Sequence, residues 1–175
     1  MKNKIFKKIL IISFHLFFFS YVMAEDKFIF ESDIIEYKDN QNLIIAKGNV
    51  KITSSNQVII YADESKYFKL DNKLFLIGNV EIIDEAEDIT IKSNKINYDR
   101  NKELIESNLE TEIKIGNNYL INTSNLNYLK LKKILKSNNK TTLIDNFSNK
   151  AETSDFIYYL NDKKFKSKDL RLVDK

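Results

Sequence analysis

The acidic segment of residues 84–88 is the part of the sequence whose side chains come closest to a chemical site. It reads Asp84-Glu85-Ala86-Glu87-Asp88, and carboxylate oxygens are the ligands that calcium prefers in proteins. The segment lacks the glycine-containing spacing that organises a calcium-binding loop. We therefore interpret it as a solvated loop, and we predict neither a metal site nor a cofactor.

Catalytic residue types are scarce. His15 is the only histidine and the sequence has no cysteine, so the commonest general base, the thiol nucleophile and the usual zinc ligands are missing after residue 15. Serine, aspartate and tyrosine are plentiful, but the prominent ones return at regular intervals. A catalytic group is needed once, whereas a structural group is needed in every repeat. We predict that the chain is not an enzyme.

Lysines gather in the last third of the chain. They lie at positions 130, 132, 133, 136 and 140 and at positions 163, 164, 166 and 168. Such groups can bind the phosphates of a lipid head group or another protein. They can equally protect exposed strands, because lysine at a sheet edge blocks unwanted pairing. Both interpretations stay open.

Residues 1–24 have the composition of a secretory signal peptide. Four lysines precede an apolar run over residues 9–22, and Val22-Met23-Ala24 is typical of a cleavage site directly before two acids. We predict cleavage there, which leaves residues 25–175 as one domain. An uncleaved membrane anchor is the alternative, since the apolar run is nearly long enough to sit in a bilayer.

Removal of this leader changes the charge balance. The sequence has 28 basic and 25 acidic residues, and four of the bases but none of the acids lie in residues 1–24, which leaves 24 bases against 25 acids. A nearly neutral chain offers no basic stripe for nucleic-acid phosphates, so we predict no nucleic-acid partner. Without cysteine the exported chain forms no disulfides, and its stability must come from sheet packing.

Two Gly-Asn pairs, Gly48-Asn49 and Gly78-Asn79, mark an internal repeat. Each pair lies between apolar, β-branched runs, and both residue types tolerate a positive φ angle, which suits a tight bend or a bulge between strands. After each pair, apolar and charged residues alternate, as in Val50-Lys51-Ile52, which is the pattern of a half-buried strand. Ser107-Asn108 and Ser137-Asn138 occupy the equivalent places later in the chain.

A tyrosine that follows a small-polar pair such as Ser32-Asp33 or Ala62-Asp63 extends this repeat. These tyrosines lie at positions 37, 67, 98, 128 and 158, so the period is 30 or 31 residues. One repeat comprises about two strands and two turns, and self-similarity at such a period is typical of a stacked β architecture. Residues 126–135 also fit a helical spacing, but the register of the repeat favours strands there.

The motifs Ala46-x-Gly48-Asn49-Val50-x-Ile52 and Ile60-x-Ala62-Asp63-x-x-x-Tyr67 resemble those of the OstA-like domain of the lipopolysaccharide transport machinery. That family includes the periplasmic bridge protein LptA and the amino-terminal periplasmic domain of LptD. The resemblance covers nearly all of residues 25–175, strongly for residues 28–100 and weakly beyond. The repeats start directly after the leader and drift later, as in the LptD region. The large membrane barrel into which LptD continues does not fit in 175 residues, however, and the family's inter-domain cysteines have no counterpart. A complete LptA-like protein and a truncated LptD both stay open.

The resemblance implies an all-β fold, in which an antiparallel sheet of about ten strands, five in each layer, folds over into a β-jellyroll that is open along one side. It also implies a function in the periplasm, in association with the outer membrane. The apolar interior would shield the acyl chains of lipopolysaccharide and pass the lipid toward the outer membrane. The candidate groove-facing residues share one parity of the sequence: Val50, Ile52, Ile60, Ala62, Leu76, Val80, Ile82, Ile96, Tyr98, Leu126, Tyr128, Phe156 and Tyr158.

The two ends of the sheet are a second predicted surface. Unpaired edge strands invite strand addition, so residues 28–35 and 170–173 are expected to join the domain to other Lpt proteins. An export signal, repeats and a lack of catalytic groups also fit an exported β-solenoid with a structural or adhesive role. That alternative predicts a closed apolar core, which has the same alternation as a groove lining.

Overall fold

The structure, a computed structural model, describes residues 28–55 and 57–173, so the predicted leader lies outside the described residues. This part of the chain forms sixteen strands and one short 3-10 helix, η1 (Lys130–Lys132). The all-β prediction is therefore confirmed, and strands flank the single helical turn within residues 126–135. The strands are β1 (Ile29–Glu31), β2 (Ile34–Lys38), β3 (Leu43–Thr53), β4 (Val58–Phe68), β5 (Lys73–Asp84), β6 (Ile89–Asp99), β7 (Leu104–Ser107), β8 (Thr111–Ile115), β9 (Tyr119–Thr123), β10 (Leu126–Leu129), β11 (Ile134–Ser137), β12 (Thr141–Asp145), β13 (Lys150–Thr153), β14 (Phe156–Tyr159), β15 (Lys164–Lys166) and β16 (Arg171–Val173).

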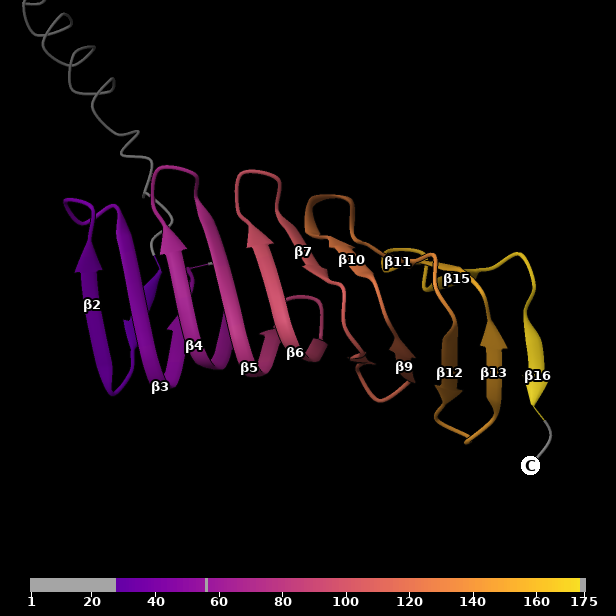
Figure 1. Ribbon diagram of the computed structural model, residues 1–175. Coiled ribbons are helices and arrows are strands. Elements are labelled where there is room, and N and C mark those ends of the chain that lie inside the picture. Colours follow the sequence, from indigo (N-terminus) through magenta and orange to yellow (C-terminus); the bar gives the residue numbers. More distant parts are fainter. Residues whose placement is uncertain (1–27, 56, 174–175) are drawn as a thin grey trace, which may run out of the picture.

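These strands make ten passes across one antiparallel sheet. Strands β3 to β6 are unbroken passes of 11 or 12 residues, whereas each of the other six passes is broken in its middle into two short strands. Four unbroken and six broken passes account for the sixteen strands. This number exceeds the ten strands predicted, because six of the ten passes are broken into two strands. Each pass pairs with the next one along the chain, and Figure 1 shows them side by side from β2 to β16.

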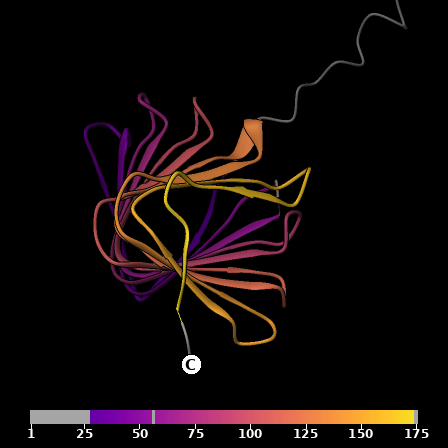
Figure 2. The same cartoon turned by 90° about the vertical axis from the view of Figure 1, so that its right-hand side faces the viewer.

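Every pass bends near its middle, and this bend folds the sheet into two layers (Figure 2). The first half of β3 pairs with β2, and its second half pairs with β1. The same division continues along the sheet. The first layer holds β2, β7, β10, β11, β14 and β15, the second layer holds β1, β8, β9, β12, β13 and β16, and β3 to β6 cross both. Each layer thus contains part of all ten passes, not the five strands expected, because one pass serves both layers.

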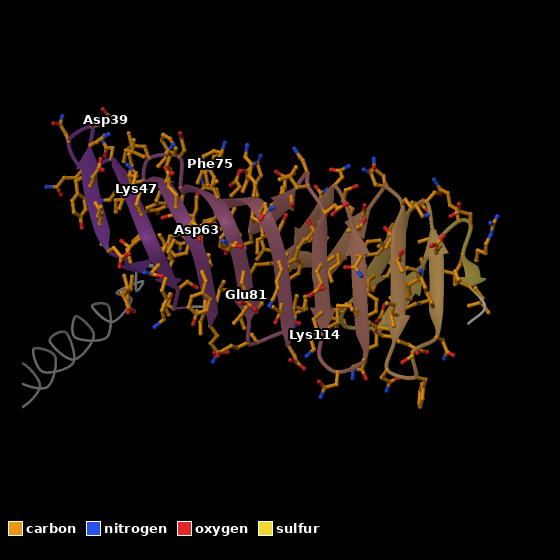
Figure 3. All side chains as sticks on the ribbon, turned by 60° about the horizontal axis from the view of Figure 1, so that its bottom comes forward. Asp39, Lys47, Asp63, Phe75, Glu81 and Lys114 are labelled. Atoms are coloured by element: carbon orange, nitrogen blue, oxygen red, sulfur yellow. The ribbon has the colours of Figure 1, made fainter. Side chains whose placement is uncertain are left out.

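The hydrophobic core lies between the two layers. Leu74 and Leu76 of the first layer and Ile60 and Ile82 of the second are at most 1% exposed. The outer faces are polar, and Figure 3 shows the labelled side chains of Glu81 and other charged residues along them. Neighbouring strands on these faces are joined by exposed ion pairs, as between Lys92 and Glu81 at 3.1 Å. Alternation between apolar and charged residues thus places one face of each strand inside and the other in water.

The bend between the two halves of a pass, which we call the corner, is a β-bulge in β3 and β5. Gly48-Asn49 and Gly78-Asn79 lie inside these strands, at the point where the register shifts by one residue. All four residues have a positive φ angle, +73° and +77° for the glycines and +47° and +45° for the asparagines. The asparagine side chains donate hydrogen bonds to Asp33 Oδ2 (3.0 Å) and Asp63 Oδ2 (2.9 Å) on the preceding pass. The Asp of one repeat unit and the Gly-Asn of the next therefore form one corner together.

Serine and threonine hydroxyls replace the Gly-Asn pair at the later corners. Thr123 Oγ1 donates to Ser137 Oγ (2.9 Å) and shares a second hydrogen bond with Thr141 Oγ1 (2.8 Å). The backbone N–H of Asn139 donates to Ser137 Oγ at 3.1 Å, so the side chain satisfies a backbone donor where the ladder is broken. Equivalent clusters are formed by Ser93, Ser107 and Thr111 and by Thr153, Ser167 and Asp169.

Replacing Gly78 by alanine tests the first kind of corner. A Cβ atom there would lie 2.2 Å from Asp63 Oδ2, and the positive φ angle is strained for a residue with a side chain. We expect Gly78→Ala to lower the free energy of unfolding by about 2 kcal/mol or more, measured by urea denaturation. The double variant with Asp63→Ala should lose less than the sum of the two single losses. Strictly additive losses would show that the contact with Asp63 is not the cause.

Candidate functional site

The thirteen residues predicted to face a groove all lie between the two layers, and none is more than 6% exposed. Those of the second layer are Val50, Ile52, Ile60, Ala62, Val80 and Ile82, and those of the first layer are Leu76, Ile96, Tyr98, Leu126, Tyr128, Phe156 and Tyr158. They belong to one continuous apolar cluster. In this structure the interior is therefore filled by side chains that pack across it.

Following one parity of the sequence missed seven of the 23 buried residues that the structure describes in this cluster. Ile89, Ile91, Ile105, Ile113 and Ile121 are odd-numbered, and each is at most 1% exposed within the same cluster. Turns and corners of varying length shift the inward-facing parity from pass to pass. The alternation of apolar and polar residues in Ile89-Thr90-Ile91 was the available signal for these residues, because it shows within a single strand which side chains face inward.

The interior reaches the surface beside β1 and β2. A pocket of about 850 Å³ there is lined by apolar residues, including Phe28 and Phe30, and by the cationic side chains of Lys69 and Arg100. The Phe28 ring packs edge-on against Tyr67, with 5.3 Å between the ring centroids, and lies 4.3 Å from the Arg100 guanidinium carbon. This end of the molecule thus combines an apolar surface with positive charge.

Opposite the corners, the free ends of the two layers approach one another along a line that we call the mouth. Aromatic pairs join the layers toward each end of it. Phe28 of the second layer packs against Tyr98 of the first, with 6.1 Å between the ring centroids. Tyr119 of the second layer packs against Tyr158 of the first at 5.9 Å. Apolar contacts therefore hold the mouth together near both ends.

The middle of the mouth is held by charge, in a group that we call the central bridge. It consists of Asp84 and Glu87 from the second layer and Tyr128, Lys130 and Lys133 from the first. Lys130 Nζ pairs with Asp84 Oδ2, and Tyr128 Oη donates to the same oxygen at 3.0 Å. Lys133 Nζ lies 2.8 Å from Glu87 Oε1. The side chains that meet here are more than forty positions apart in sequence.

Asp84 is 1% exposed, so the prediction of a solvated loop was wrong for this residue. Its second oxygen, Oδ1, is buried and has no hydrogen-bond donor among the described residues. Burial and the adjacent Asp84 carboxylate raise the pKa of the Tyr128 hydroxyl, because both disfavour a phenolate anion. Tyr128 therefore stays protonated and acts as a donor. A buried ion pair with an unsatisfied oxygen contributes little net stability.

The remaining acidic side chains of this segment do not converge on a metal site. Glu85 and Asp88 are exposed, and Glu87 is paired with Lys133. Within residues 28–55 and 57–173 no cluster of three metal-ligating side chains is found. Over the same residues, no helix has the length and apolar character needed to cross a membrane.

Among the described residues, four of the nine clustered lysines form ion pairs with acids of the same chain. Besides Lys130 and Lys133, the Lys140 ammonium lies 3.3 Å from Glu152, on the outer face. Lys168 lies 3.3 Å from Asp155, near the last corner. The lysines of β15, in contrast, lie on a strand that pairs on one side only, where positive charge opposes unwanted strand addition.

Both ends of the sheet present strands with a single partner among the described residues. At one end β1 and β2 each pair only with β3, and at the other β15 pairs with β14 and β16 with β13. Apolar side chains on these edges are exposed, including Ile29 (63%), Ile34 (54%) and Leu172 (75%). Both edges thus carry unpaired backbone groups next to apolar surface.

A family model described as OstA-like protein matches residues 25–173. The chain belongs to the OstA-like family. Among solved structures, the chain is similar to LptH, described as the LptA-homologous periplasmic component of the lipopolysaccharide transport device of Pseudomonas aeruginosa. That match has 10% sequence identity and a TM-score of 0.35, and it covers 86% of this chain and 96% of LptH. No curated protein sequence gives a significant match.

Substitutions at the central bridge test whether the fold needs the buried ion pair or needs only that Asp84 is not buried without a partner. We expect Lys130→Met to lower the free energy of unfolding by about 3 kcal/mol or more, because it leaves the Asp84 carboxylate buried without a counter-charge. The triple variant Asp84→Leu, Tyr128→Phe and Lys130→Met should be as stable as the parent chain or more so. Urea denaturation measures both. A triple variant less stable than Lys130→Met would contradict this account.

Proposed function

We propose that this OstA-like chain is a periplasmic carrier domain of the lipopolysaccharide transport machinery. It holds acyl chains between its two layers and passes the lipid toward the outer membrane, without chemistry of its own. The observation that carries the proposal is the continuous apolar interior that runs between the layers across all ten passes. The same role fits an LptA-like protein and the amino-terminal region of an LptD-like one.

The dimensions of the interior suit this role. Ten passes have nine intervals, and at ~4.8 Å between strands each layer is roughly 43 Å long. An acyl chain that lies along this direction contacts several passes at once. Each methylene removed from water contributes about 0.8 kcal/mol, so the lipid is held strongly without a specific contact and can slide between similar apolar surfaces.

Loading requires the layers to separate, because Ile82 and its neighbours already pack across the interior. Acyl chains that enter replace contacts between side chains of the two layers with contacts between side chains and lipid. Both kinds of contact are apolar, so the exchange leaves little new apolar surface in water. The pocket next to Phe28 and Arg100 is one place where an acyl chain first meets the interior.

A closed core with a structural or adhesive role is the alternative, and the complete burial of all thirteen candidate residues favours it. Both functions share the fold, so only the behaviour of the interior toward lipid distinguishes them.

Photo-crosslinking from position 82 tests the proposal. Ile82 is buried between the layers, whereas Glu81, its neighbour on β5, points outward (Figure 3). A photoreactive residue at position 82 should give a lipid adduct in cells that carry labelled lipopolysaccharide, whereas the same residue at position 81 should give none. A folded, exported chain without an adduct at either position would instead support the closed core.

End-to-end association with like domains is the second part of the proposal. The single-partner strands at both ends supply backbone donors and acceptors for strand addition. The exposed apolar side chains of Ile34 and Leu172 would be covered in such a contact. Chains joined in this way would form a continuous path for the lipid.

Lysine substitutions on the edges test this association. Ile34→Lys and Leu172→Lys place charge on exposed edge positions, and we expect them to reduce co-purification with Lpt partners at least about tenfold. Ile77→Lys is the matched control, because Ile77 is 42% exposed but lies on the central strand β5. If the control disrupted association as strongly as the edge variants, the edges would not be the contact.

A further inference from the structure

We propose that the central bridge is a phosphate-responsive closure of the mouth, a step that rests on the proposed lipid carriage. In this structure, Lys130 and Lys133 pair with Asp84 and Glu87 and connect the two layers. A lipid whose head group carries phosphate offers these lysines a competing anion. When the lysines exchange carboxylate for phosphate, the two layers lose the ion pairs that join them at the middle of the mouth, and the mouth opens over the acyl chains.

The position of the bridge supports this inference. It lies between the aromatic contacts of Phe28 with Tyr98 and of Tyr119 with Tyr158, opposite the corners that join the layers covalently. A pocket of about 250 Å³ lies against it, lined by residues that include Asp84, Lys130 and Leu131. Leu131, in the helical turn η1, is 77% exposed, so apolar surface lies directly beside the two lysines.

The chemistry of the bridge also suits a connection that is broken and remade. An apolar contact at this place would close the mouth at lower desolvation cost than a buried ion pair. Asp84 Oδ1, buried without a donor among the described residues, adds to the cost of the closed form. Lys133 and Glu87 are more accessible, with 42% and 21% of their side chains exposed, and they are the pair that an incoming phosphate meets first.

Substitutions of Lys133 and Glu87 test whether phosphate competes with Glu87 for the lysine or whether the ion pair only stabilises the closed mouth. The probes are bis-phosphorylated lipid A and the same lipid after enzymatic removal of both phosphates, dispersed in detergent. Lys133→Gln should weaken binding of the phosphorylated lipid up to about fivefold, because a phosphate contact is lost. Glu87→Gln should tighten it by a similar factor, because the lysine is already free. Neither variant should change binding of the dephosphorylated lipid by as much.

Lys92→Gln and Glu81→Gln are the matched controls. They break an ion pair of similar geometry on the outer face, with 53% and 32% of the side chains exposed, and should change binding of neither lipid. Shifts in the same direction for Lys133→Gln and Glu87→Gln, or equal binding of the two lipids by the parent chain, would overturn the inference while leaving lipid carriage intact. If the parent chain bound neither lipid, the proposed function would fail as well.

The opening itself is measured with spin labels on the double variant Ala86→Cys and Leu131→Cys. Labelling is specific because the sequence contains no cysteine. Both positions are exposed, one on each side of the mouth. The phosphorylated lipid should increase the distance between the labels more than the dephosphorylated lipid does. An unchanged distance in the presence of bound phosphorylated lipid would overturn the opening step.

Discussion

The corner is the constraint on which the rest of this fold depends. Each pass crosses the whole sheet, so without a bend in its middle the ten passes would form one wide sheet with an uncovered apolar face. The bend must recur at the same place in every pass, and the repeat of 30 or 31 residues supplies it. Two chemistries serve the same purpose: an Asp and a Gly-Asn bulge in the early passes, and buried hydroxyl clusters in the later ones. The later repeats have thus changed how they bend, not whether they bend.

A sheet folded at one side has an interior that is covalently closed at the corners and closed only by side-chain contacts at the mouth. The chemistry of those contacts changes along the mouth. Aromatic rings meet toward both ends, whereas Asp84, Tyr128 and Lys130 meet in the middle. Aromatic contacts strengthen with burial, while an ion pair loses solvation as it is buried. The middle of the mouth is therefore the part whose strength an outside charge can change.

The sequence was sufficient to predict the repeat and its strands, because strand alternation and turn residues are local signals. The folded-over sheet, in contrast, was implied by the resemblance of its motifs to the OstA-like family. The sequence was insufficient for two features that depend on distant residues. Selecting inward-facing residues by one parity of the sequence missed Ile89 and Ile113, because turns and corners of varying length change which side of a pass faces inward. Asp84 looked like part of a solvated loop because its partners, Tyr128 and Lys130, lie 44 and 46 residues further along. The expectation of five strands per layer failed for a related reason, because a repeat does not reveal that each pass bends between layers.

A carrier of acyl chains must satisfy two requirements that oppose one another. An empty interior lined by isoleucine and leucine would expose apolar surface at about 25 cal/mol per Å², so the layers have to collapse onto each other when no lipid is present. A loaded interior must then separate without unfolding. Corners that join the layers covalently and a mouth closed only by side-chain contacts meet both requirements, because the layers can swing apart about the corners while the hydrogen-bond ladders within each layer persist. The burial of Ile82 and its neighbours is therefore compatible with a carrier, and the interior is a permanently closed core only if nothing can open the mouth.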